Sequence, residues 1–158
     1  MVTISNCLWF DGNAQEAVEF WTSLVEGSAI GDVSYYPEGA QLPEGTVLMM
    51  TFTLAGEHFS ALNGGPQYRF SPAHSIQLNA PDQAAADRYW DALTAEGGEE
   101  GQCGWCTDRF GMSWQVIPAG LGELLGDPDP VRAARANEAL MVMKRIDIEA
   151  LRRAADGE

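Results

Sequence analysis

The residues best suited to chemistry gather in the stretch GQCGWCTDRFGMSWQ, residues 101–115. It contains Cys103-Gly-Trp-Cys106, the Cys-x-x-Cys spacing of redox and metal motifs. A redox pair needs its first thiol at a helix N-terminus. Glycines precede this motif and a turn at Asp108–Gly111 follows it, so we predict a strand over about residues 101–107. In a strand, residues i and i+3 point to opposite faces about 10 Å apart, too far for a disulfide.

A zinc site finds little more support. Structural zinc usually takes two such pairs, whereas this chain has one pair, Cys7 and two histidines. We therefore expect Cys103 and Trp105 to share one face of their strand. By the same alternation, Cys7 and Trp9 share a face of the first strand.

The composition restricts the function classes. The chain has 158 residues and a net charge of −14, with nine Lys and Arg in all, which disfavours nucleic acid and anionic membranes. A cationic ligand is compatible with this charge. The N-terminus has no signal-peptide pattern, no apolar run reaches membrane-span length, and the cysteine number is odd. We expect a cytoplasmic protein with reduced thiols.

A strand–helix unit occurs twice in the sequence. Helical apolar spacing follows Asn13, which with Glu16 forms a predicted capping box, and recurs after Pro81-Asp82. The two helices match at a constant offset of 69 residues, Ala17, Phe20, Trp21 and Leu24 corresponding to Ala86, Tyr89, Trp90 and Leu93. Unrelated amphipathic helices with a shared aromatic pair remain the alternative. A duplication predicts two similar strand–helix modules, each of which forms half of one domain.

Further strands complete the modules. In the first module, strands are predicted at residues 6–10, 28–36, 46–54 and 58–62, with a turn-rich segment at 37–45. In the second, they are predicted at 75–80, 101–107 and 112–117, one strand fewer. From residue 119 the pattern becomes helical, with Asp147 as a possible N-cap. This tail is either a packed appendage or, through Met141, Met143 and Ile146, a dimer contact.

Three segments carry a family resemblance: CLWFDGNAQEAVEFW, LNGGPQYRF and FGMSWQVIP. With the paired modules they resemble the PhnB-like branch of the glyoxalase/bleomycin-resistance (vicinal oxygen chelate) superfamily. The resemblance implies an α+β fold of two βαβββ modules that curl around a cleft. The implied organisation is a domain over 1–118, with modules at about 3–65 and 74–118, and a helical extension over 119–158. A homodimer is also implied.

The resemblance also implies where a metal would bind. In the superfamily's metal enzymes, four strands supply His or Glu to one ion. The matching positions here are Ser5 or Asn6, Ala61 or Asn63, Ser75 and Gln115. Hydroxyls, amides and a methyl group do not replace those ligands, so we expect no metal and no other cofactor. His74 lies one residue from such a position and is expected on the other face.

Proteins of this branch often carry the label 3-demethylubiquinone-9 3-methyltransferase. The glycine-rich strand–helix turn that approaches S-adenosylmethionine does not follow an early strand here, so the sequence does not support that activity.

Two functions remain. The first is binding of a small planar molecule in an aromatic and amide-lined cleft. The second is a metal-independent enzyme, of lyase or isomerase type, that uses a cleft cysteine, Cys7 or Cys103. The enzyme lacks a visible base, because His58 and His74 are expected off the cleft. The alternative to a ligand-binding role is that Trp9 and Trp105 are ordinary core residues. The predicted ligand-binding residues are Trp9, Asn63, Gln77, Trp105 and Gln115, with Trp114 as a further stacking candidate.

Overall fold

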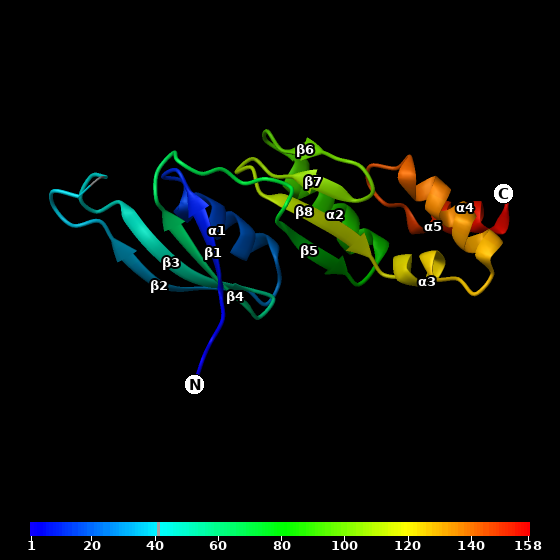
Figure 1. The fold of residues 1–158 in the computed structure, drawn as a ribbon, viewed down its shortest axis with the longest axis horizontal. Helices are drawn as coiled ribbons and strands as arrows, with labels where there is room; N and C mark the ends of the chain where they lie inside the picture. Colours follow the sequence, from blue (N-terminus) through cyan, green and yellow to red (C-terminus); the bar gives the residue numbers. More distant parts are fainter. Residues whose placement is uncertain (41) are drawn as a thin grey trace. The chain divides into compact units, whose positions relative to one another are not determined.

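The computed structural model describes residues 1–40 and 42–158, and these form two compact units, residues 1–70 and 71–158. Each unit contains one four-stranded mixed sheet with a helix against it (Figure 1). Gln41, within the predicted turn-rich segment, lies outside the described residues. In the part of the chain that is described, no helix combines the length and apolarity that crossing a bilayer requires.

Unit one follows the predicted βαβββ order. Its elements are β1 (Asn6–Phe10), α1 (Ala14–Leu24), β2 (Ala29–Tyr35), β3 (Val47–Leu54) and β4 (Glu57–Asn63). The strand order is β1-β4-β3-β2, with β1 parallel to β4 and the other neighbours antiparallel.

Unit two repeats this arrangement and then continues. Its elements are β5 (Ser75–Ala80), α2 (Gln83–Thr94), β6 (Glu99–Glu100), β7 (Trp105–Thr107), β8 (Ser113–Pro118), α3 (Leu121–Leu125), α4 (Pro130–Met141) and α5 (Ile148–Asp156). The sheet order is β5-β8-β7-β6, which matches unit one strand for strand. The predicted α+β class and the duplication are thus confirmed.

The prediction that the second module lacks a strand was wrong. Glu99 and Glu100 form β6 and pair with Thr107 and Cys106. A Cβ on Gly98 would lie 2.2 Å from the Leu93 carbonyl oxygen and 3.0 Å from that of Thr107. Glycine at position 98 lets the backbone pass close to the helix end and to the neighbouring strand. The Gly97-Gly98 pair therefore ends the helix and leads directly into β6.

One helix covers one face of each sheet. In unit one, α1 buries Ala17 and Trp21, and in unit two, α2 buries Ala86 and Trp90. Strand side chains that alternate with the buried ones point to the opposite face, which none of the helices described for the same module covers. Each module therefore presents an open sheet face.

The predicted capping box at Asn13 does not form, because the Asn13 side chain makes no cap hydrogen bond. Asn63 from β4 replaces it. Its Oδ1 accepts from the Ala14 N–H at 3.0 Å, and its Nδ2 donates to the Val47 carbonyl at 2.8 Å. Asn63 is 1% exposed, and both ends of its carboxamide serve the fold. The predicted cap Asp147 is confirmed for α5, and Asp82 caps α2 at the predicted start of that helix.

We expect Asn63→Ala to lower the free energy of unfolding by about 2–3 kcal/mol, since it leaves a helix N–H and a strand carbonyl unpaired in the core. Urea unfolding measures this change. Asn79→Ala, the same truncation at an exposed position of β5, should change stability by less than about 0.5 kcal/mol. Equal effects of the two variants would contradict the capping role.

Candidate functional site

Three predicted ligand residues of unit two form one row across its open face. Gln77 of β5 pairs with Gln115 of β8, which pairs in turn with Trp105 of β7. Directly paired residues on neighbouring strands point to the same side, so the two amides and the indole lie next to one another. Gln77 is exposed and the other two are half-buried, which leaves all three within reach of a ligand.

The two amides are oriented by neighbours on the same face. Gln115 Nε2 donates to Ser75 Oγ at 2.9 Å, and Gln77 Nε2 donates to Asn79 Oδ1 at 2.8 Å. Neither amide oxygen makes a hydrogen bond with a described residue. Each amide thus presents an acceptor and a remaining N–H in a fixed direction.

Among the described residues of these rows, the charged side chain is Glu99. The adjacent row contains Ser75, Ser113 and Thr107 and ends at Glu99 on the edge strand. None of the eight described strands contains Lys or Arg. An anion would find no positive partner in the described strands, which disfavours anionic ligands on this face.

Trp114 belongs to the core and not to the open face. It is fully buried, and its Nε1 donates to Asp108 Oδ2 at 2.8 Å. Asp108, 2% exposed, also accepts from the Phe110 and Met112 N–H groups. Much of the FGMSWQ motif is therefore explained by a buried carboxylate that shapes a turn, and Trp114 is withdrawn as a stacking residue.

The predicted strand position of Cys103 was wrong. Cys103 lies in a turn, with φ of 55°, and the Trp105 N–H closes that turn on the Gln102 carbonyl. The Cys103 thiol lies 3.5 Å from the Leu140 carbonyl oxygen and 3.9 Å from Met141 Sδ, in the helical extension. Cys103 therefore does not share a strand face with Trp105.

Cys106, the second thiol of the motif, is buried. Burial, followed by the nearby Asp108 and Glu100 charges, raises its pKa to about 12. Such a thiol stays protonated at neutral pH, which is unsuited to redox exchange. All three cysteines are free thiols.

The open face of unit one contains two further rows. Cys7 pairs with Ser60, which pairs with Thr51, and Trp9 pairs with Leu62, which pairs with Met49. Cys7 and Trp9 thus share a face, as predicted. The position that corresponds to Gln115 of β8 is Ser60 of β4, whereas Ala61 and Asn63 point into the core and are 0% and 1% exposed.

Trp9 is held in place by the chain that follows β4. Its Nε1 donates to the Gly65 carbonyl at 2.8 Å, and Tyr68 meets its ring edge to face at 5.0 Å. A Cβ on Gly64 would lie 2.2 Å from Trp9 Cζ2. The Trp9 indole is therefore half-buried and fixed in orientation, and its Nε1 already donates a hydrogen bond.

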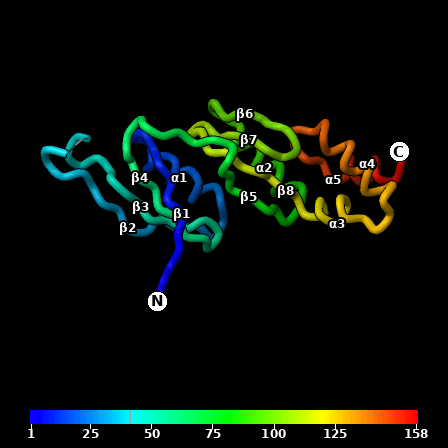
Figure 2. Tube along the Cα trace, viewed as in Figure 1, coloured from blue at the N-terminus to red at the C-terminus, as the bar shows by residue number. Residues whose placement is uncertain are grey.

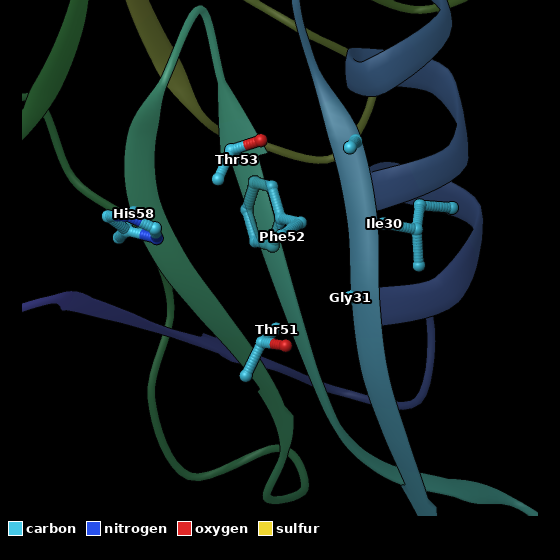
Figure 3. A pocket seen from close by; sticks show the side chains of 7 residues that line it. Ile30, Gly31, Thr51, Phe52, Thr53 and His58 are labelled. Carbon is cyan, nitrogen blue, oxygen red and sulfur yellow. The ribbon is translucent and has the colours of Figure 1, made fainter.

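Two shallow hollows of about 310 and 220 Å³ lie on this face and share Thr51 and His58. Figure 3 shows the smaller one. The larger also includes Ser5 and Ser60, and the smaller includes Gly31. Sequence reasoning placed His58 off the cleft, but its alternation with Ser60 along β4 puts it on the open face. That two-residue spacing was the signal that could have found it.

The donor set does not fit a transition metal. The open-face positions that would supply ligands hold Ser5, Ser60, Ser75 and Gln115. Hydroxyls and one amide bind zinc, nickel or iron poorly. No group of three or more His, Cys, Asp or Glu able to hold an ion occurs among residues 1–40 and 42–158.

The fold defines an α+β protein made of two similar modules, each with an open sheet face. Comparisons with known proteins identify its family. Residues 2–117 match the family described as 3-demethylubiquinone-9 3-methyltransferase. The chain belongs to this family, which confirms the predicted PhnB-like membership. No curated protein matches the chain.

Solved structures agree. The PhnB protein of Bacillus cereus, whose name also carries the 3-demethylubiquinone-9 3-methyltransferase designation, is 32% identical with a TM-score of 0.69. The match covers 75% of this chain and 100% of that one. Protein PA1353 of Pseudomonas aeruginosa shares the fold at 22% identity and a TM-score of 0.61, covering 75% of this chain and 98% of that one.

We expect Gly64→Ala to displace the Trp9 ring, because the new methyl group overlaps it. Tryptophan emission should shift to longer wavelength, acrylamide quenching should increase, and stability should fall by about 1–3 kcal/mol. Gly122→Ala in α3, where a Cβ meets nothing within 4 Å, is the matched control and should leave the emission unchanged. Unaltered emission in Gly64→Ala would show that Trp9 is not fixed by this contact.

Proposed function

We propose that this protein binds a small, planar, uncharged or cationic organic molecule on the open face of unit two. The observation that carries the proposal is the row Gln77–Gln115–Trp105. The indole offers a stacking surface, and the two amides offer paired donors and acceptors beside it. A planar carboxamide or lactam has the complementary edge and a ring to stack.

The other predicted residues contribute differently. Cys7 and Trp9 lie on the open face of unit one and remain candidates for ligand contact. Asn63 is omitted, because its carboxamide is occupied in the core. The predicted homodimer and cytoplasmic location remain predictions. Methyltransferase activity is not proposed, since β1 and α1 are joined by Asp11-Gly12-Asn13, which is not a glycine-rich nucleotide loop.

The proposal is tested with benzamide as the probe. Benzamide should quench tryptophan fluorescence and raise the melting temperature, because ligand that binds only the folded state stabilises it. Acetamide, which has the amide without the ring, should bind more weakly. Gln115→Leu should weaken benzamide binding by about three- to tenfold, the worth of one hydrogen bond.

Gln15→Leu makes the same change on the exposed surface of α1 and serves as the matched control. It should leave binding unaltered. Binding that is equal in Gln115→Leu and the parent chain, or the absence of binding by any planar amide, would overturn the proposed site.

A second function has its own observation, the placement of His58. Cys7 pairs with Ser60, and His58 lies two residues before Ser60 on the same face, so the imidazole is diagonal to the thiol. Imidazole is a common base for a catalytic thiol. We infer that His58 is the base for Cys7 that the sequence did not reveal, and a metal-independent thiol enzyme is the alternative function. Cys103 is left out of it, since its thiol faces the extension.

Iodoacetamide labelling followed by mass spectrometry tests this pair. At pH 8, Cys7 should react fastest, and Cys106 should stay unlabelled because a pKa of about 12 leaves only about one thiolate in ten thousand. His58→Ala should slow Cys7 at least threefold without affecting Cys103, and His74→Ala should change neither rate. Cys7 labelling that is indifferent to His58 would remove the thiol enzyme from consideration.

A further inference from the structure

The helical extension has no counterpart in the relatives compared above. The family match ends at residue 117, and the Bacillus cereus protein is covered completely by three quarters of this chain. The extension is nonetheless well packed. It has its own core within unit two, formed by Leu121, Leu124, Ala136, Leu140, Ile146, Ile148, Leu151 and Ala155.

The connection between α4 and α5 runs beside the turn that precedes β7 (Figure 2). Backbone hydrogen bonds join the two segments. The Cys103 N–H donates to the Met143 carbonyl at 2.8 Å, and the Gly104 N–H donates to that of Lys144 at 2.7 Å. Both turn residues have positive φ, 55° and 81°. A Cβ on Gly104 would lie 2.6 Å from Ile146 Cδ1, so the turn is shaped to the extension.

Side chains hold the same connection to α2 and β6. Gln83 Nε2 donates to the Ile146 carbonyl at 2.9 Å, while Gln83 Oε1 accepts from the Ile148 N–H at 3.0 Å. Lys144 pairs with Glu100 at 3.3 Å. Trp90 first, and then Lys144, lower the pKa of Glu100 by hydrogen bonding to its charged form. The extension is therefore fixed relative to the sheet of its own unit.

The extension also reaches the open face. Ile117 follows Gln115 by two residues in β8 and so points to the same side. Ile117 is half-buried and packs against the core of the extension. Cys103, just ahead of Trp105, packs against the same core. The amide and indole row thus has an apolar boundary on the side of the extension.

We propose that Ile117 of β8, held in place by the core of the extension, forms an apolar end wall for the ligand of unit two, which makes the extension a specificity element. A ligand held by Gln77, Gln115 and Trp105 then carries an apolar group directed at that wall. This inference rests on the proposed function and deepens it, from a planar amide to a planar amide with an alkyl or aryl substituent.

Benzamides with methyl, ethyl or propyl groups at the 3 or 4 position test the wall. In the parent chain, one of the two series should bind more tightly with each added carbon, by about threefold, as expected for burial of a methylene. Ile117→Ala should remove most of this gain and leave the affinity for unsubstituted benzamide within about twofold. Ile117→Leu should keep the gain.

Leu125→Ala is the matched control, because Leu125 packs against the same core from α3 and not from the sheet. It should lower the melting temperature about as much as Ile117→Ala and retain the chain-length dependence. If Ile117→Ala does not fold, the test rests on whether the affinity of the parent chain and of Ile117→Leu increases with the length of the substituent.

The failures are distinguishable. If benzamide itself does not bind, the proposed function and this inference fall together. If benzamide binds but neither series gains affinity with chain length, or if Ile117→Ala keeps the gain, the end wall is wrong and the amide site stands.

Discussion

Both halves of this protein depend on one constraint, that a single helix can cover only one face of a four-stranded sheet. In unit one, Trp21 of α1 and the core side of the strands exclude water together, and in unit two Trp90 of α2 does the same. Strand alternation then sends every second side chain to the uncovered side. Polar and aromatic residues occupy many of those positions, and everything proposed about function follows from which residues alternate outward.

The open faces present hydroxyl and amide groups, which form hydrogen bonds more readily than they bind a transition metal. The resemblance implies ion ligands at Gln115 and at Ala61 or Asn63, but the register puts Ser60, not Ala61 or Asn63, at the open-face position that corresponds to Gln115. An amide cannot polarise a carbonyl as an ion does, but it specifies a partner by direction and by donor–acceptor pattern. The described strands contain no Lys or Arg, which disfavours an anionic partner. The loop between β1 and α1, Asp11-Gly12-Asn13, does not match the family's methyltransferase designation, and we propose instead that an open sheet face holds a flat molecule.

Sequence patterns predicted the elements better than the contacts that join them. Helix and strand periods located nearly every element, because they report burial on one face, and the 69-residue offset identified the duplication. Asn63 was assigned to the ligand, since nothing local reveals that β4 ends beside the first turn of α1. Cys103 was placed in a strand, because its left-handed turn depends on carbonyls of the extension forty residues later. Gln77, Gln115 and Trp105 were each predicted to contact a ligand, but only the strand register shows that they form one row.

The central claim is that a planar amide lies on this row. It is tested most directly by NMR of ¹⁵N-labelled protein during a benzamide titration, observing the glutamine side-chain amides and the indole N–H groups. We predict saturable shifts of Gln77, Gln115 and Trp105, with the buried indoles of Trp90 and Trp114 unmoved. Shifts confined to other residues, or no saturable shift at this row, would contradict the account.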